Sequence, residues 1–210
     1  AQKIVSKSEN RFKNLLEINP SEKAIKFGKS LGRDPSFMQL ILDESNEILS
    51  TEKNVIIVEH KLGYININAG IDRSNISKNK DLVLLLPENP KKSANDIQLQ
   101  ISSQLNKDIS VIITDSMTRP YRSGVTNFAI ASSNIQSLID LKGEEDIFGN
   151  ELHATEIAIA DELAAAAGLL MGQGNDMKPV VIIKGFDRSN YSVNNAYDLI
   201  VNKDEDLYRF

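Results

Sequence analysis

The sequence predicts a mixed α/β fold in which helices pack on layers of β-sheet. Residues 82–86 form an apolar run typical of a strand, residues 97–105 carry apolar side chains at helical spacing, and residues 109–113 are again apolar and β-branched. A strand, a helix and a strand in this order predict a βαβ unit over residues 82–115, with a right-handed crossover and parallel pairing of the two strands.

Length and composition indicate a single domain over residues 1–210, built as one body or as two lobes that share a core. The chain has 210 residues, of which 41% are hydrophobic. No apolar run approaches the roughly 20 residues that a membrane helix needs. The first residues show no signal-peptide pattern, so we expect a cytoplasmic protein without a membrane partner.

The charged and metal-binding residues narrow the classes of function. There is no cysteine, which excludes disulfides, thiolate metal sites and cysteine nucleophiles. His60 and His153 are the two histidines, too few to supply an ordinary zinc site. The net charge of −5 argues against nucleic acid as the main partner. Acidic oxygens that hold a hard cation are the metal chemistry left for this composition.

Caps and alternation predict the remaining elements. Asn19-Pro20 and Asp34-Pro35 each place a capping side chain before a proline, which predicts helices over 20–31 and 35–49, the first ending at Gly32. Further strands are expected at 1–7, 55–59, 62–67, 128–131 and 180–183, and further helices at 93–105, 154–171 and 196–201. The chain begins with Ala1 inside the first of these strands, so we expect the natural protein to begin before residue 1.

The segment of residues 109–128 is the first candidate site. Its apolar run stops at Asp115 and Ser116, and ligands in open α/β sheets bind beyond the carboxyl ends of such strands. The loop that follows carries Arg119 and Arg122, whose guanidinium groups suit bidentate contact with phosphate or carboxylate. The alternative is an aspartate that caps a turn, with two surface arginines beside it.

Two further segments hold candidate ligands. Residues 68–75, NAGIDRSN, form a glycine turn in which Asp72 could ligate a metal and Asn75 could contact a base or ribose; an Asx-turn without a ligand fits equally well. Lys3 and Lys7 either face a phosphate or are solvated. The glycines of residues 172–174 end the alanine-rich helix. The acidic residues on that helix, Glu156, Asp161 and Glu162, form a solvated face or part of a site.

Seven separated motifs, in this order, resemble those of the coenzyme F420-0:L-glutamate ligase family. They are QKIVSK with Arg11, NAGIDRSN, LLLPENP, ITDS followed by RPYRSGVTNFAI, DIFGNEL, ATEIAIADELAAAAGLLMGQG and PVVIIKGF. Together they span the chain from residue 1 to about residue 186.

The resemblance implies an enzyme that uses GTP to attach L-glutamate in γ linkage to coenzyme F420-0. A terminal carboxylate would first be phosphorylated to an acyl phosphate, which the glutamate amine then attacks. Two divalent ions, Mg or Mn, would bridge the nucleotide phosphates, and a monovalent cation is a further candidate cofactor. The resemblance also implies an intertwined homodimer and a nucleotide-contacting loop before residue 1.

The same resemblance assigns roles to individual residues. Asp72 and Asp115 match ligands of the first metal, Ser116 matches a hydroxyl ligand of the second, and Gln173 stands where an acidic ligand of the second metal can occur. An amide oxygen is a weaker ligand for a hard cation than a carboxylate. The positions that match GTP contacts are Gln2, Lys3, Lys7, Asn75, Met171, Gly172, Gln173, Gly174, Asn175, Asp176 and Met177. Arg119 and Arg122 are assigned to anionic substrate groups on chemical grounds alone.

Two other functions are compatible with the same residues. A metal-dependent phosphohydrolase would use the carboxylates to hydrolyse GTP without an acceptor. A nucleotide-binding module without catalysis would retain GTP affinity and show no turnover. The ligase is distinguished from both because it releases GDP and phosphate only when glutamate and the deazaflavin acceptor are present.

Overall fold

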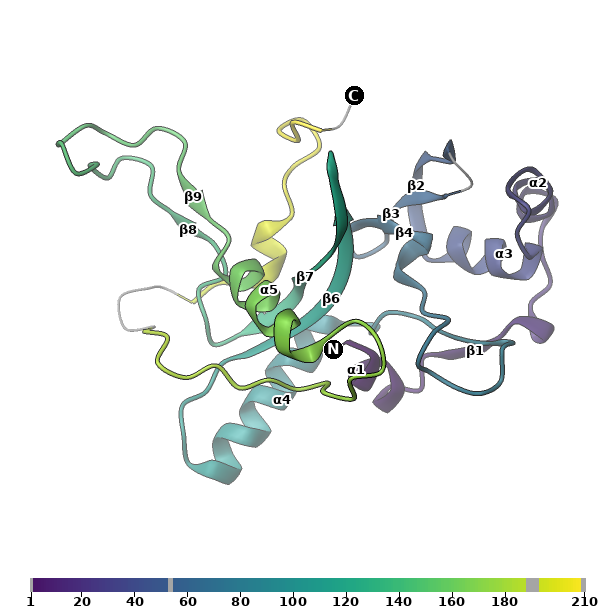
Figure 1. The fold of residues 1–210 in the computed structure, drawn as a ribbon, viewed down its shortest axis with the longest axis horizontal. Helices are drawn as coiled ribbons and strands as arrows, with labels where there is room; N and C mark the ends of the chain where they lie inside the picture. Colours follow the sequence, from purple (N-terminus) through teal and green to yellow (C-terminus); the bar gives the residue numbers. More distant parts are fainter. Residues whose placement is uncertain (1, 53–54, 188–192, 209–210) are drawn as a thin grey trace. The chain divides into compact units, whose positions relative to one another are not determined.

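The computed structural model describes residues 2–52, 55–187 and 193–208 (Figure 1). The chain divides into two compact units, Gln2–Glu88 and the residues from Asn89 onward. Within the described residues there are five α-helices and four small sheets, in which all strand pairs are antiparallel. The mixed α/β class is confirmed, whereas parallel pairing is absent from the part of the chain that the structure describes.

The N-terminal unit is built from short elements. They are α1 (Gln2–Ser8), β1 (Phe12–Asn14), η1 (Leu15–Glu17), α2 (Glu22–Leu31), α3 (Pro35–Asp43), β2 (Ser45–Ser50), β3 (Ile57–His60), β4 (Ile65–Ile67), η3 (Asn68–Gly70) and β5 (Leu82–Leu84). β1 pairs with β5, and β2, β3 and β4 form a sheet in that order. Its core packs α3 against β3 through Phe37, Met38, Ile41 and Val58, each at most 1% exposed.

The C-terminal unit is organised around one long hairpin. Its elements are α4 (Pro90–Leu105), β6 (Val111–Arg119), β7 (Arg122–Ser133), β8 (Ile139–Asp140), β9 (Glu156–Ile157), α5 (Ile159–Met171) and η4 (Ala196–Leu199). α4 and α5 both pack on the β6–β7 hairpin, from opposite faces (Figure 1). The residues between β8 and β9 form a narrow protruding loop that contains the acidic segment 143–152 and is closed by a bridge between Glu145 and Glu151.

The predicted helix caps of the N-terminal unit are mostly confirmed. The Asp34 carboxylate accepts a hydrogen bond from the Ser36 amide at 2.7 Å, and Pro35 occupies the first turn of α3. Gly32 ends α2 in the left-handed conformation, with φ of 61°. The N-cap of α2 is Ser21 rather than Asn19, because its hydroxyl accepts from the Ala24 amide.

The first residues form helix α1, so the strand predicted at 1–7 is wrong. Gln2, Val5 and Ser6 are buried, and their spacing of three and four is that of one helix face. A single apolar pair, Ile4-Val5, is too short to fix the alternation of a strand. The helical conformation directs Gln2 and Lys3 toward Asp72, a contact that the local pattern does not reveal.

The second predicted helix is shorter than expected. α3 ends at Asp43 instead of residue 49, and residues 45–50 form β2. The Ser45 hydroxyl donates to the carbonyl of Ile41 and helps close the last turn. β2 then pairs with β3, and this tertiary pairing overrides the helical propensity of the residues.

The predicted βαβ unit at 82–115 is also wrong. β5 pairs antiparallel with β1, and β6 pairs antiparallel with β7, so the two strands belong to different sheets. A two-residue turn, Pro120-Tyr121, gives β6 an antiparallel partner next to it in sequence. Tyr121 has φ of 58°, the positive φ that a turn with proline at its first central position requires at the second when it is of type II.

The strand that carries Asp115 does not end there, as the sequence led us to expect. β6 continues to Arg119, which places Asp115 and Ser116 in its middle. The segment from Arg119 to Gly124 is therefore a hairpin turn with the start of β7, not a loop. The strand predicted at 128–131 is confirmed as part of β7.

α4 differs from the prediction in its start and in its buried face. Asn89 caps it, accepting a hydrogen bond from the Lys92 amide, so the helix begins at Pro90 instead of near Ser93. Its buried residues are Pro90, Ala94 and Gln98. The predicted apolar face is largely exposed, since Ile101 and Leu105 are 37% and 58% exposed.

The last part of the chain contains less regular structure than predicted. α5 begins at Ile159 instead of residue 154, and ends before Gly172 as expected. Residues 180–183, predicted to be a buried strand, belong to no helix or strand, and Val180 and Ile182 are 73% and 78% exposed. The short helix predicted near residue 196 is confirmed as η4.

Candidate functional site

The first group of predicted residues meets around Asp72 in the N-terminal unit; we call Gln2, Lys3, Lys7, Asp72 and Asn75 the Asp72 cluster. Gln2 Nε2 donates to Asp72 Oδ2 at 2.5 Å, and Lys3 Nζ lies 3.0 Å from Asp72 Oδ1. Lys7 Nζ donates to the carbonyl of Asn75 at 3.5 Å. The structure therefore brings together all five predicted residues of this unit.

The Asp72 carboxylate is held by its backbone and by α1. The backbone of Asp72 exchanges two hydrogen bonds with that of Leu84 in β5, at 2.8 and 2.9 Å. Gln2, only 1% exposed, is fixed in turn by the Ser6 hydroxyl, which donates to Gln2 Oε1 at 2.9 Å. A rigid strand neighbour and a locked helix side chain thus fix the position of the carboxylate.

The electrostatics of Asp72 favour an additional positive charge. Burial raises the pKa of Asp72 above its ordinary value, while the ammonium groups of Lys3 and Lys7 and the hydrogen bond from Gln2 oppose this shift. Because burial remains the larger effect, the ion pair with Lys3 offsets only part of the cost of placing this charge in a half-buried position. A metal cation would complete this compensation.

The second group of predicted residues lies on the α5 face of the hairpin, where Thr114, Asn127, Met171 and Gln173 form what we call the Gln173 cluster. Gln173 Nε2 donates to Asn127 Oδ1 at 2.6 Å. Asn127 Nδ2 and the Thr114 hydroxyl both approach Met171 Sδ, at 3.7 and 3.9 Å. These contacts tie the end of α5 to the hairpin. Gln173 Oε1, the atom that would coordinate a hard cation, takes no part in the hydrogen bond with Asn127.

Strand register places Ser116 beside this cluster and Asp115 on the other face. Ser116 is opposite Asn127 and Asp115 is opposite Phe128. Since successive residues of a strand alternate between faces, Ser116 shares the face of Asn127, and Asp115 shares the face that α4 covers. The two neighbouring candidate ligands are thus presented by opposite faces of one hairpin.

The glycine loop, residues 171–177, folds over its own aspartate. Gly172 has φ of 70°, and a Cβ at this position would collide with the Asp176 carboxylate. The Gly174 amide donates to Asp176 Oδ2 at 3.4 Å. Glycine is therefore required at position 172. Residues 173–177 are exposed, including Asn175 and Met177.

Arg119 and Arg122 face each other where the hairpin turns. They are a register pair flanking Pro120 and Tyr121. Arg119 Nη1 is enclosed, with no hydrogen-bond partner among the described residues. The structure thus brings the two predicted arginines together.

Sequence analysis missed Asn127 and treated Asp161 as a member of an undivided acidic face. Asp161 Oδ1 accepts a hydrogen bond from the Ala129 amide at 2.8 Å, and burial raises the pKa of Asp161. Glu156 instead pairs with Lys142 at 2.8 Å on the surface. Recognising the hairpin would have revealed Asn127, because the register sets it opposite Ser116.

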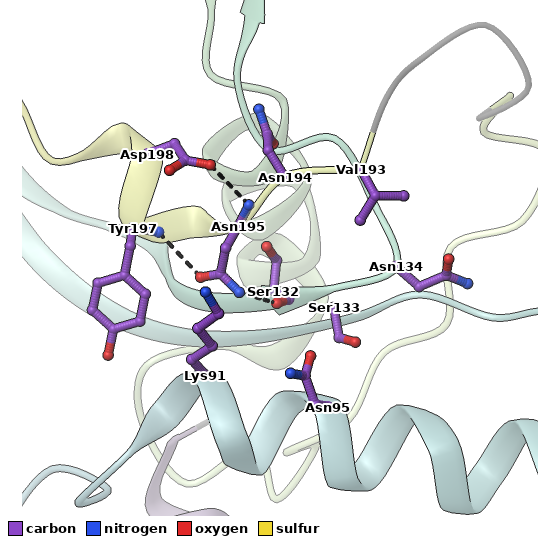
Figure 2. Close-up of a pocket in the computed structure, with 10 residues that line it drawn as sticks. All are labelled: Lys91, Asn95, Ser132, Ser133, Asn134, Val193, Asn194, Asn195, Tyr197 and Asp198. Atoms are coloured by element: carbon purple, nitrogen blue, oxygen red, sulfur yellow. Dashed lines mark hydrogen bonds between the residues drawn. The ribbon is translucent and has the colours of Figure 1, made fainter.

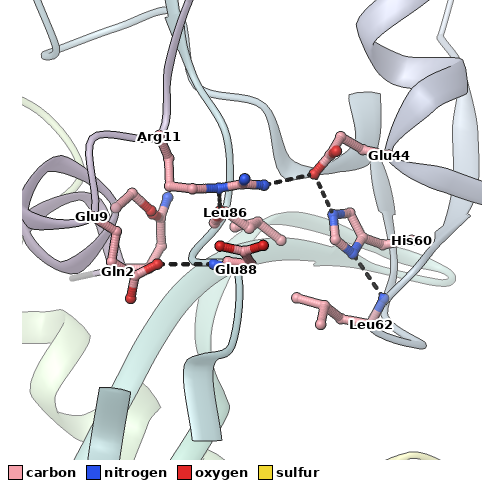
Figure 3. A network of polar contacts seen from close by, with 9 residues as sticks. Gln2, Glu9, Arg11, Glu44, His60, Leu62, Leu86 and Glu88 are labelled. Carbon is pink, nitrogen blue, oxygen red and sulfur yellow. Dashed lines mark hydrogen bonds and ion pairs between the residues drawn. The ribbon is translucent and has the colours of Figure 1, made fainter. Parts of the chain in front are cut away.

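A buried polar network lies elsewhere in the N-terminal unit (Figure 3). Arg11 Nη2 lies 3.1 Å from Glu44 Oε2, and Arg11 Nε donates to the carbonyl of Leu86 at 3.0 Å. His60 Nδ1 accepts from the Leu62 amide at 2.9 Å, with His60 Nε2 3.7 Å from Glu44. These contacts link the end of α3 to β3 and to the segment after β5, which is a structural role.

A cavity of about 320 Å³ opens at the far end of β7 (Figure 2). Most of its polar groups already have structural partners. Asn194 binds the backbone of residues 137 and 138, and Asn195 caps η4 and donates to the carbonyl of Ser132. The cavity is therefore a polar junction that attaches η4 to the hairpin.

The predicted metal ligands suit a hard divalent cation in their chemistry. Carboxylate, hydroxyl and amide oxygens are the donors that Mg²⁺ and Mn²⁺ prefer. Within residues 2–52, 55–187 and 193–208, no three His, Cys, Asp or Glu side chains gather as a metal site. A site made of the predicted residues would depend on Ser116 and Gln173 as well as on carboxylates.

None of the described helices has the length and apolar character needed to cross a membrane.

Comparison with known proteins decides the family. A family model described as F420-0:Gamma-glutamyl ligase matches residues 1–185. The chain belongs to the F420-0:gamma-glutamyl ligase family. It is therefore an enzyme, and the resemblance seen in its motifs is confirmed.

Named relatives in the F420-0:gamma-glutamyl ligase family are similar over most or all of the chain. The protein named coenzyme F420:L-glutamate ligase from Methanococcus maripaludis strain C7 is 44% identical over 209 residues, which is 100% of this chain and 83% of the relative. The protein of that name from Methanocaldococcus jannaschii is 44% identical over 211 residues, 100% of this chain and 82% of the relative. The one from Methanothermobacter thermautotrophicus is 40% identical, covering 89% and 73%.

Proposed function

We propose that this chain uses GTP to add L-glutamate in γ linkage to coenzyme F420-0, through an acyl phosphate. Family membership supports the ligase class. The observation that supports the nucleotide-dependent mechanism is the Asp72 cluster, in which Lys3 and Lys7 of α1 flank a half-buried carboxylate. Paired ammonium groups beside a candidate metal ligand are suited to a metal-bound polyphosphate.

The proposed chemistry runs in two steps. The terminal carboxylate of the acceptor attacks the γ-phosphorus of GTP, the bond to the β-phosphate oxygen breaks, and GDP leaves. The amine of L-glutamate then attacks the acyl carbon, phosphate leaves, and the amine loses a proton as the amide forms. Phosphorylation is needed because a free carboxylate has no good leaving group.

Each predicted residue has a role in this proposal. Asp72 and Asp115 are ligands of a first divalent ion, Mg or Mn, and Ser116 and Gln173 are ligands of a second. Such ions would offset the negative charge that develops on the transferred phosphoryl group. Lys3, Lys7, Gln2, Asn75 and the glycine loop 171–177 contact the nucleotide.

We further propose that the enzyme is a homodimer. Val180 and Ile182 are exposed in an extended segment, and Leu169 and Leu170 of α5 are 86% and 62% exposed. Large apolar side chains that are exposed in a single chain are candidates for burial in an interface. Light scattering should give twice the mass of one chain, and replacing Ile182 by Glu should shift the protein toward the monomer.

The decisive experiment measures GDP and phosphate release with each substrate omitted in turn. A ligase releases both products only when L-glutamate and the acceptor are present, and chelation of divalent ions abolishes the release. GTP hydrolysis that ignores the acceptor would indicate a phosphohydrolase instead. GTP binding without any release of GDP would indicate a nucleotide-binding module.

A matched pair of substitutions tests the metal assignment. Asp115→Asn should lower turnover by orders of magnitude, because a neutral amide cannot replace a carboxylate on a divalent ion. Asp140→Asn is the control, since this exposed aspartate of the same unit forms its ion pair with surface Lys142. Equal activity of the two variants would remove Asp115 from the mechanism.

A further inference from the structure

The end of the β6–β7 hairpin holds two like charges against each other. Arg119 and Arg122 are directly opposite in register, separated by the turn residues Pro120 and Tyr121. Opposite residues of an antiparallel pair have Cβ atoms about 4.5–5.5 Å apart, and like charges at this distance destabilise the pair. The turn of the hairpin therefore contains an electrostatic repulsion between Arg119 and Arg122.

No counter-charge within the described chain relieves this repulsion. Neither guanidinium forms an ion pair or a hydrogen bond with any other residue that the structure describes. Arg119 Nη1 is also enclosed without a partner, a state that native structures rarely leave unsatisfied. Two adjacent guanidinium forks without internal partners are a site for oxyanions supplied by a ligand.

The position of the pair relates it to the proposed reaction. Arg119 follows Asp115 by four residues along β6, about 13 Å, so alternation places these two residues on the same face of the strand. Ser116, opposite Asn127, lies on the other face. A small molecule held by the arginines would therefore lie on the face that presents Asp115, the residue proposed to hold the first metal ion.

We infer that Arg119 and Arg122 bind the two carboxylates of the incoming L-glutamate. This inference rests on the proposed ligase function. The amine of L-glutamate must remain free to attack the acyl carbon, so only its two carboxylates are available for recognition. Two planar forks side by side match a dicarboxylate, one bidentate contact to each group.

The test compares L-glutamate with L-glutamine, which lacks the γ-carboxylate. In Arg119→Gln and Arg122→Gln, the KM for L-glutamate should rise roughly tenfold to hundredfold, the range expected for a lost charge-assisted contact. One of the two variants should also lose most of the preference for L-glutamate over L-glutamine, measured as the ratio of kcat/KM values. The KM values for GTP and for the acceptor should stay unchanged.

Lys91→Gln is the matched control, because it removes one positive charge from the same unit. Lys91 is exposed beside Ser133, which is 11 residues from Arg122 along β7, or about 35 Å. It should leave every KM unchanged. Arg122→Lys should recover only part of the affinity, because an ammonium keeps the charge and loses the bidentate geometry.

Binding of glutarate separates the failure of this inference from that of the proposed function. Glutarate carries both carboxylates without the amine, so calorimetry should detect its binding to the wild type and a loss in both Arg→Gln variants. Arg-dependent glutarate binding without ligation would retain the subsite and refute the ligase. Ligation with an unchanged glutamate KM in both variants, or a KM effect confined to GTP or the acceptor, would overturn the inference.

Discussion

Replacing Asp72 by Asn should separate folding from function. The structure shows Gln2 and Lys3 both donating to the carboxylate, at 2.5 and 3.0 Å. An asparagine offers one oxygen, and its amide nitrogen is itself a donor. Because Gln2 is 1% exposed and its own oxygen accepts from Ser6, it cannot turn away, so the new asparagine must present its oxygen to Gln2.

The substitution then removes the ion pair between Lys3 and Asp72. The Lys3 side chain is 26% exposed and can turn to solvent, so the loss is that of a partly exposed ion pair, at most about 1 kcal/mol. Removing the half-buried negative charge works in the opposite direction, because burial raises the pKa of the Asp72 carboxyl and so disfavours its charged form. The net change should lie within about 1 kcal/mol, which corresponds to about 4 °C or less in Tm for a chain of this size.

Asp72→Ala is the matched comparison. It leaves the buried Gln2 amide without an acceptor, at a cost of about 1–3 kcal/mol, so its Tm should fall below that of Asp72→Asn. Both variants should lose metal-dependent turnover. The measurements are thermal unfolding and GDP release on the same preparations. A large loss of stability in Asp72→Asn would make Asp72 structural, and full turnover would remove it from the metal site.

Three further outcomes follow from other residues. The interaction with His60, 3.7 Å away, followed by the charge of Arg11, lowers the pKa of Glu44 despite burial, so Glu44 stabilises the fold above its ordinary pKa of 4.5 and loses that effect as the pH falls below it. The Tm difference between wild type and Glu44→Gln should therefore shrink in acid. Gly168→Ala in α5 would set a Cβ 2.9 Å from Asn127 Cγ, and should lower kcat without unfolding the protein. Asp146, whose pKa is lowered by hydrogen bonds from the Asn150 and Phe148 amides, orders its turn, so Asp146→Ala should speed proteolysis there.

Local signals in the sequence predicted the ends of helices correctly where one side chain determines the backbone conformation. Asp34 before Pro35 predicted the start of α3, and Gly32 predicted the end of α2, because a cap and a left-handed glycine act on their immediate neighbours. The class of fold followed from the mixture of helical and alternating apolar patterns. Such patterns do not depend on knowing which strands pair.

Strand pairing could not be predicted in the same way. The order of strand, helix and strand over residues 82–115 favours parallel pairing, yet β5 pairs with β1 and β6 with β7. The partner of β5 lies about 70 residues earlier, and the partner of β6 depends on a turn at Pro120-Tyr121 that has no glycine. Tyrosine at φ of 58° is uncommon, so the usual hairpin signal was missing.

The candidate site was predictable from motifs and not from local chemistry. Lys3, Lys7 and Asp72 are ordinary surface residues by composition, and only the family resemblance grouped them before the structure did. Asn127 was missed because its role depends on register with Ser116 and on the position of Gln173. Alternation along β6 also places Asp115 and Ser116 on opposite faces, which was not predicted because the strand was expected to end at Asp115.

Each unit contains charged side chains that other residues of the chain do not fully neutralise, and these charges indicate the sign of charge that a ligand would supply. Asp72 is a half-buried carboxylate whose burial Lys3 compensates only in part, while Arg119 and Arg122 are cations without an internal anion among the described residues. A sequence selected for stability alone would neutralise each of them. A divalent cation would satisfy the first and a dicarboxylate the second. Saturating Mn²⁺ with GTP should therefore raise the Tm of the wild type more than that of Asp72→Asn, and glutarate should raise it more than that of Arg122→Gln.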